Sequence, residues 1–127
     1  MKELQAAWRE LRADVDALGA EREQYRELFD GASDAYLLSD ADGVIRDVNF
    51  AAVDLLQRRR QALRGKPLAA LVALEARTPF RAFLGAIRDA LSSARTVLDR
   101  SGARFAVELS ARRVPSGSLL IRLRATR

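Results

Sequence analysis

The sequence predicts an α+β domain with a five-stranded antiparallel sheet, helices gathered on one face of that sheet, and a long N-terminal helix. Three observations lead to this prediction. The first 30 residues repeat apolar side chains at helical spacing, residues 35–48 and 96–125 divide into short strand-like segments, and the stretch between them has helical spacing again. Strands that flank a helical middle in this order favour the α+β class.

The composition is that of a folded chain without cysteine or histidine chemistry. Of 127 residues, 49% are apolar and 31% are charged, and Cys and His are both absent. Their absence excludes disulfides, thiolate nucleophiles, Cys/His zinc sites, imidazole-ligated haem and Ser-His-Asp catalysis. We expect residues 1–30 to form an amphipathic coiled-coil helix and residues 31–127 to form one domain.

The sequence favours a cytoplasmic protein. The longest apolar run, Leu68 to Leu74, is far shorter than the roughly 20 residues that span a bilayer. No basic-then-apolar signal peptide opens the chain, and a cysteine-free chain fits a reducing compartment. We therefore expect no membrane partner.

The charge is distributed unevenly along the chain. Residues 1–34 carry five Lys/Arg against nine Asp/Glu, or −4, and residues 35–127 carry seventeen against eight, or +9, which gives the total of +5. An acidic helix thus precedes a basic domain. The two can attract each other, or each can attract a different partner.

The predicted N-terminal helix, Lys2 to Phe29, carries apolar side chains in steps of 4, 3, 4 and 3 residues. We call this set the heptad seam: Leu4, Trp8, Leu11, Val15 and Leu18. Its mean spacing of 3.5 is typical of a left-handed coiled coil, so the heptad seam is the predicted homodimer interface. Arg22 interrupts it, and the turns beyond are expected to dock on the domain. A solitary helix packed on its own domain is the alternative, and the sequence leaves parallel or antiparallel pairing open.

A hairpin and short helices are predicted next. Residues 35–39 and 44–48 form strands joined by a turn at 40–43, where Gly43 supplies a positive φ. Asn49 caps a short helix over 50–57. Further helical turns are expected over residues 61–64 and 68–74.

The second half begins with a longer helix, predicted from Pro79 to Ser93 with Thr78 as its N-cap. Its buried side chains are expected to be Phe80, Phe83, Leu84, Ile87 and Leu91. Strands follow over 96–99, 104–114 and 118–125, with turns at Ser101–Gly102 and 115–117. Leu120 breaks the polar face of the last strand, so something is expected to cover that side, with the N-terminal helix as the candidate.

Four segments together resemble the PAS family, from about residue 25 to the end. They are Tyr25–Phe29 with Ser33–Ala35, then Asp40–Ile45 with Asn49 and Ala51–Ala52, then Gly65–Leu68, and finally Ser101–Ser110. The resemblance implies a sheet of order 2-1-5-4-3 and a pocket between the sheet and the helices. It implies a sensing and dimerisation module, typically preceded by a coiled-coil helix and placed upstream of a histidine kinase, a cyclase or another output domain, as in two-component systems.

No cofactor is carried over from that resemblance. The chain lacks the Cys that light-sensing flavin members use for adduct formation and the proximal His of haem-binding members. An apolar set could line a ligand cavity or form a filled core, and any ligand would be apolar or weakly polar. The set is Leu38, Val53, Leu56, Leu68, Leu71, Phe80, Phe83, Leu84, Val107 and Leu109.

Other polar groups have simpler explanations. Asp40 and Asp42 could hold a cation or act as acid and base, but Asp is also favoured in tight turns. Asn49 could contact a ligand or cap a helix. The basic run 58–60, with Arg64 and Lys66, could meet phosphates or form a solvated face. Sparse aromatics and the lack of a nucleic-acid motif do not favour nucleic-acid binding.

The sequence therefore predicts a dimeric sensory module that relays a signal to an output domain or partner through its N-terminal helix. A ligand-free structural dimerisation module is the first alternative, and a basic nucleic-acid-associated protein is the second. Enzyme activity is not expected, since no nucleophile and base pair is evident and no catalytic or metal-ligating residue is assigned.

Overall fold

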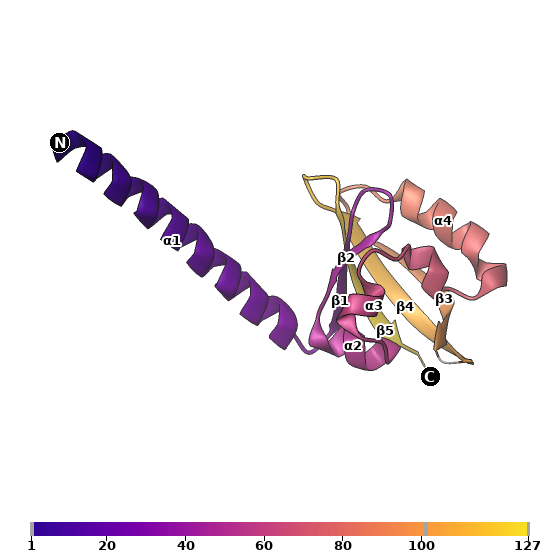
Figure 1. The fold of residues 1–127 in the computed structure, drawn as a ribbon. Helices are drawn as coiled ribbons and strands as arrows, with labels where there is room; N and C mark the ends of the chain where they lie inside the picture. The colour runs from indigo at the N-terminus through magenta and orange to yellow at the C-terminus, as the bar shows by residue number, and fades with distance from the viewer. Residues whose placement is uncertain (1, 101, 127) are drawn as a thin grey trace. The chain divides into compact units, whose positions relative to one another are not determined.

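A computed structural model describes residues 2–100 and 102–126. The chain divides into two compact units, one up to Asp30 and one from Gly31 onward, and each is described by itself. The first is the helix α1 (Lys2–Gly31). The second contains, in order, β1 (Ala35–Ser39), β2 (Ile45–Val48), α2 (Phe50–Leu56), α3 (Arg60–Leu63), the 3₁₀ turns η1 (Leu68–Leu71) and η2 (Leu74–Ala76), α4 (Arg77–Ala86), β3 (Ser92–Arg100), β4 (Ala103–Arg113) and β5 (Leu119–Ala125) (Figure 1).

The five strands form one antiparallel sheet in the order β2-β1-β5-β4-β3. This confirms the predicted sheet and its order. The register places Leu37 opposite Ile121, and the β1–β2 pairing shifts between Leu38 and Ser39. The first and last strands of the domain are therefore neighbours, with β1 in the interior of the sheet.

One face of the sheet carries the core. Leu37, Val107 and Ile121 are fully buried, whereas the residues next to them in sequence are more exposed, because successive strand side chains point to opposite faces. In Figure 1, α2 and α3 lie in front of β1 and β2, against which they pack, and α4 lies to the right. Their apolar faces, with Ala52, Leu56 and Leu63, complete the core cluster.

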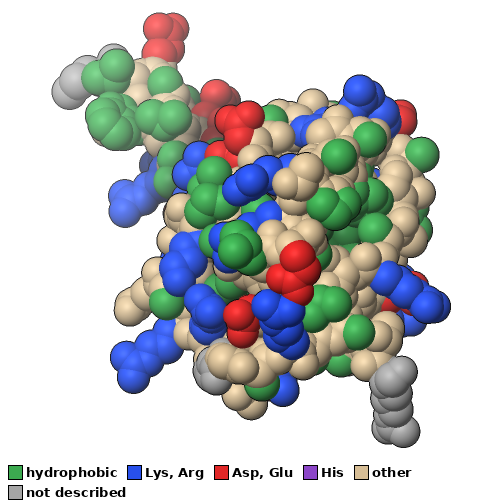
Figure 2. Space-filling model, turned by 90° about the vertical axis from the view of Figure 1, so that its right-hand side faces the viewer, with side chains coloured by type: hydrophobic (Ala, Val, Ile, Leu, Met, Phe, Trp, Pro, Cys, Tyr) green, Lys and Arg blue, Asp and Glu red, His purple; other side chains and the backbone are tan. Residues whose placement is uncertain are grey.

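The surface of the domain is rich in basic side chains. Figure 2 looks onto the side that carries α4 and shows Lys and Arg side chains spread among smaller apolar patches. Within the residues described, no helix combines the length and apolar character that a membrane crossing needs.

Asp40 holds the β1–β2 turn together. Its Oδ1 accepts hydrogen bonds from the Asp42 N–H (3.0 Å) and the Val44 N–H (2.9 Å), and its Oδ2 accepts one from Arg46 (3.1 Å). The hydrogen bond from Val44, then that from Asp42 and the charge of Arg46, hold the pKa of Asp40 below its usual value. Gly43 has a φ of +84°, and a Cβ there would lie 3.3 Å from Leu84. The carboxylate of Asp40 thus stabilises the β1–β2 turn.

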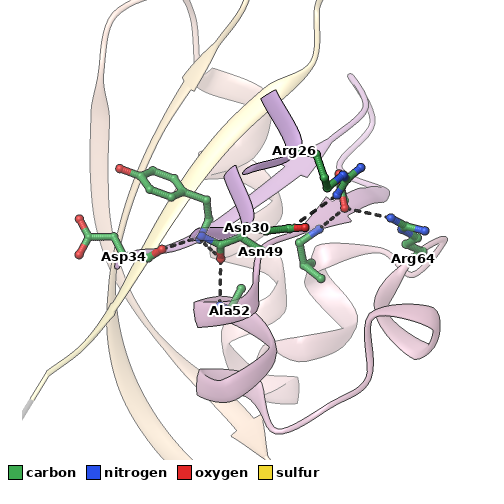
Figure 3. A network of polar contacts seen from close by, with 9 residues as sticks. Arg26, Asp30, Asp34, Asn49, Ala52 and Arg64 are labelled. Carbon is green, nitrogen blue, oxygen red and sulfur yellow. Dashed lines mark hydrogen bonds and ion pairs between the residues drawn. The ribbon is translucent and has the colours of Figure 1, made fainter. Parts of the chain in front are cut away.

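Asn49 joins three segments from a fully buried position (Figure 3). Its Oδ1 accepts hydrogen bonds from the Tyr36 N–H of β1 (2.9 Å) and the Ala52 N–H of α2 (3.0 Å). Its Nδ2 donates to the Asp34 carbonyl in the loop before β1 (2.8 Å). The predicted N-cap is confirmed, and the same amide also fixes β1 and the loop that precedes it.

The longest predicted helix of the domain was placed wrongly. It begins at Arg77, so Thr78 is not its N-cap, and it ends at Ala86 rather than Ser93. Residues 92–100 instead form β3, much longer than the predicted strand 96–99, because each of them pairs with β4. Leu91, expected to be buried, is exposed. Past Ala86 the helical spacing gives way to contacts that only the folded chain provides, because Arg113 of β4 binds the carbonyls of Ile87 and Arg88, and strand pairing begins at Ser92.

Residues 68–74 were also predicted as one helix, whereas the structure has two 3₁₀ turns separated at Val72 and Ala73. Val72 forms an isolated bridge with Leu98, and the Ala73 N–H donates to the Val97 carbonyl (2.9 Å), which pulls the chain out of helical geometry. Elsewhere the predicted bounds differ by one residue, as at β2 and β4, or by two, as at the end of α1. The turn predicted at Ser101–Gly102 falls partly on Ser101, outside the described residues.

We predict that Asn49→Ala destabilises the domain by about 3 kcal/mol, since it removes the partner of one buried N–H group, one part-buried N–H group and one part-buried carbonyl. Asn49→Ser is expected to cost less, because a serine oxygen can still cap α2. Urea unfolding followed by circular dichroism measures both. A loss below about 1 kcal/mol for Asn49→Ala, the cost of a cap alone, would contradict the three-segment role.

Candidate functional site

A groove between α4 and β3 is a candidate ligand site. Its volume is about 350 Å³, and its exposed lining is mostly apolar. Pro79, Phe80 and Phe83 come from α4, and Leu109 lies beneath them on β4. The β3 side is formed by Ala94, Arg95, Thr96 and Val97, with Ala76 at the start of α4.

Arg113 fixes the C-terminal end of α4, the helix that borders this groove. Its guanidinium donates to the carbonyls of Ile87 (3.1 Å) and Leu84 (3.4 Å) at the end of α4, and to that of Gly117 (2.7 Å) in the β4–β5 turn. A cation at a helix C-terminus also meets the negative end of the helix dipole. The position of α4 over the sheet is therefore tied to β4, where Arg113 ends the strand.

Most of the predicted pocket residues do lie on the inner side of the sheet. Phe80, Phe83 and Leu109 line the groove. The others pack in or against the buried core cluster rather than around one cavity, and these are Val53, Leu56, Leu68, Leu71, Leu84 and Val107. The set is thus shared between a filled core and the wall of a groove.

Leu38 is not brought to the groove. It lies opposite Leu120 of β5 and is half-buried, while its neighbour Leu37 is fully buried in the core. Since strand residues alternate, Leu38 points to the outer face of the sheet. A shallow hollow of about 140 Å³ on that face involves Tyr36, Leu120 and Arg122. Leu120 does interrupt a polar face, and its covering by α1 stays a prediction.

Pro79, Ala94, Arg95 and Thr96 line the groove but were not among the predicted site residues. Pro79 was assigned only to the start of a helix, and Ala94 and Arg95 fell outside every predicted strand. A longer β3 was needed to place them. The sequence offered little signal for this, because polar and apolar residues do not alternate regularly over 92–98 and helical spacing overlaps the start of that segment.

The heptad seam lies exposed on α1. The side chains of Leu4, Trp8, Leu11, Val15 and Leu18 are 57–66% exposed. Beyond Arg22, the rings of Tyr25 and Phe29 stack with centroids 5.5 Å apart. The helix α1 therefore presents an exposed apolar stripe that no other part of α1 covers.

The remaining polar candidates form local contacts. Asp40 and Asp42 belong to the turn described above, and no cluster of acidic side chains that could hold a metal ion occurs within residues 2–100 and 102–126. Arg60 lies over the ring of Phe50, 5.1 Å from its centroid, and Arg64 forms an ion pair with Asp47 (3.2 Å). Two arginines of the basic cluster thus engage neighbouring side chains of their own domain.

Comparison with known proteins supports the architecture. A family model described as the PAS fold matches residues 29–124. The chain is similar to the crystal structure of the PAS domain of an HTR-like protein from Haloarcula marismortui, with a TM-score of 0.77 and 18% identity over 91% of this chain and 99% of that one. A comparison with curated protein sequences found no significant match.

Two further structures come from sensor histidine kinases. A domain of the sensory box sensor histidine kinase/response regulator from Geobacter sulfurreducens has a TM-score of 0.71 and 25% identity over 84% of this chain and 96% of that one. A PAS domain from a two-component sensor histidine kinase has a TM-score of 0.73 and 16% identity over 85% and 98%. The family model matches residues 29–124, the sheet has the strand order expected from the resemblance, and the chain belongs to the PAS family.

Proposed function

We propose that this PAS chain is a cytoplasmic, dimeric signal-relay module without catalytic chemistry of its own. Two copies pair through the heptad seam, and a change at the groove between α4 and β3 reaches an output domain or partner protein through α1. The exposed heptad seam is the observation that carries the proposal. An apolar stripe of this length is unfavourable in water, and a second copy of the helix would bury it.

The charges beside the heptad seam favour parallel pairing. Arg12 follows Leu11 on one flank of the heptad seam and Asp14 precedes Val15 on the other, and beyond the seam Arg26 and Glu21 continue these two flanks. In a parallel, in-register pair, each residue of the second flank faces the residue five positions later on the first flank of the other copy, so Glu21 meets Arg26, while Arg12 and Asp14 face uncharged residues. In an antiparallel pair, each flank faces its own equivalent and like charges meet.

The family supports the sensory part of the proposal. PAS domains act as sensing modules, and two of the similar structures are from sensor histidine kinases. A ligand-free structural dimer is the second candidate. It is favoured by the dense core, in which Leu63, Leu71 and Ile121 are fully buried. The two candidates differ in whether the groove communicates with α1.

We predict that Leu11→Asp converts the dimer to a monomer, because it places a charge in the centre of the heptad seam. Ala13→Asp is the matched control, since it adds the same charge at an exposed position on the opposite side of the helix. Sedimentation equilibrium of both variants measures the change. An unchanged dimer in Leu11→Asp would remove the heptad seam as the interface.

We predict that Leu4→Cys forms a disulfide between copies under mild oxidation, seen as a dimer on a non-reducing gel. The chain has no other Cys, so the product is unambiguous. Near one end of the helix, equivalent residues meet only in a parallel, in-register pair. Ala6→Cys, directed away from the heptad seam, should cross-link far less. Equal yields from the two variants would contradict parallel pairing.

The relay itself can be tested with one spin label per copy at Ala20→Cys, on the outer side of α1. Ala94→Phe fills the groove and imitates an occupied site, while Ala103→Phe adds the same ring at an exposed position on β4. We expect Ala94→Phe to shift the label–label distance, measured by pulsed electron resonance, by about 1–2 Å or more. Identical distances in all three proteins would favour the structural dimer.

A further inference from the structure

One edge of the sheet is closed by the chain itself. At β2, the Ile45 N–H donates to the Lys66 carbonyl (2.8 Å), and the Ile45 carbonyl accepts from the Gly65 N–H (2.8 Å). The Leu68 N–H donates to the Gly43 carbonyl (2.8 Å), beside the isolated bridge of Val44. The segment 65–68 thus covers this edge like a short extra strand, which is a common protection of exposed edges.

In the part of the chain that the structure describes, main-chain hydrogen bonds close the opposite edge, at β3, only near its C-terminal end. There the Ala73 N–H donates to the Val97 carbonyl (2.9 Å) at the bridge between Val72 and Leu98. That carbonyl therefore points away from β4. Main-chain groups two residues apart in a strand point the same way, so those of Arg95 and Ser93 also point to the open edge. Within the described residues, no main-chain bond from outside the sheet reaches either of them.

The groove runs beside this open edge. The inward-facing side chains of Ala94 and Thr96 form its floor, and Pro79 and Phe83 of α4 form its far wall. A strand added to the edge of β3 would direct every second side chain into this apolar space. Its main chain would meet the N–H and C=O groups of Ser93 and Arg95. Figure 2 views the domain from this side.

The charge at the edge selects the partner. The exposed Arg95 lies opposite Glu108 on β4, and its other side faces the open edge. An added strand would place an outward side chain there, and an acidic one would be favourable. A second copy of β3 would bring Arg95 toward its own equivalent, on a domain that carries +9 over residues 35–127. The complementary occupant is a different, acidic chain.

We propose that the edge of β3 and the adjoining groove bind an extended segment of a partner protein, with alternating apolar and acidic residues, by strand addition. The apolar residues enter the groove against Phe83 and Pro79, and an acidic residue lies beside Arg95. This inference rests on the proposed function in one respect. The proposed function relays a change at the groove, and the inference names what occupies that groove. Binding itself does not require pairing through α1.

The test uses the full chain and fluorescein-labelled heptapeptides of alternating Val and Glu, measured by fluorescence anisotropy. We expect saturable binding of this peptide and weaker binding of its Val/Lys counterpart. Methylating two main-chain nitrogens that would face β3 keeps every side chain but removes two hydrogen bonds, and should lower affinity about 30-fold. Equal binding of the methylated peptide, or no binding of the Val/Glu peptide, would overturn the proposal.

Variants at Arg95 locate the site. Arg95→Ala keeps the main-chain donor and should retain binding of the Val/Glu peptide at reduced affinity, while Arg95→Glu should prefer Val/Lys. Arg95→Pro removes the edge N–H without touching the β4 ladder and should abolish binding. Unchanged binding in Arg95→Glu would place the peptide elsewhere and overturn the proposal. Two other results would also overturn the proposal. One is a small molecule that co-purifies with the protein and is absent from Ala94→Phe, since the groove would then hold that molecule. The other is a dimer that Arg95→Pro converts to a monomer, since the β3 edge would then bind a second copy. Sedimentation of Leu11→Asp tests the relay dimer separately.

Discussion

The buried side-chain amide of Asn49 is the constraint on which the arrangement of the domain depends. It binds the loop before β1, the main chain of β1 and the first turn of α2 at once. Because β1 pairs with both β2 and β5, a helix fixed to β1 is fixed to the whole sheet. The face on which α2 begins is thereby set, and the helices that follow cover the same core.

Arg113 forms a second set of polar contacts, which fixes the other end of the helical layer on the sheet. It binds the last carbonyls of α4 from the end of β4, so α4 stops where β3 is about to begin. Between these two ties the layer packs tightly, as the fully buried Leu63 and Leu71 indicate. The groove lies at the outer edge of that layer, where α4 leaves part of β3 uncovered. A binding site at this place can sense an occupant without opening the core.

The two edges of the sheet differ, and the difference explains why the proposed binding site lies beside β3. The segment 65–68 follows α3 closely and returns along β2, so main-chain groups at that edge have hydrogen-bond partners. Among the described residues, Ala73 alone donates a main-chain hydrogen bond to the edge of β3, and the chain then turns away to begin α4. An open edge, an apolar groove and a basic side chain thus coincide. The same residues that protect such an edge from indiscriminate pairing, such as Arg95, can select an acidic partner.

Much of the fold was predictable from the sequence because its signals are local. Gly43 and the carboxylate of Asp40 mark the first turn, and Asn49 marks the start of α2 within a few residues of its own bonds. The seven-residue repeat in α1 is also a property of neighbouring residues. Leu38 was misplaced because strand residues alternate and the sequence alone did not indicate which of Leu37 and Leu38 faces the core.

By itself, the sequence determined the number of strands, the long first helix and the cap at Asn49, since each follows from spacing or from a residue's own conformational preference. Only the tertiary structure decided where α4 ends, how long β3 is and which edge of the sheet stays open. Those features depend on pairings between distant segments, of β3 with β4 and of Val72 with Leu98. Hydrogen bonds across such distances compete with local helical preference, and here they prevail over it between residues 87 and 93.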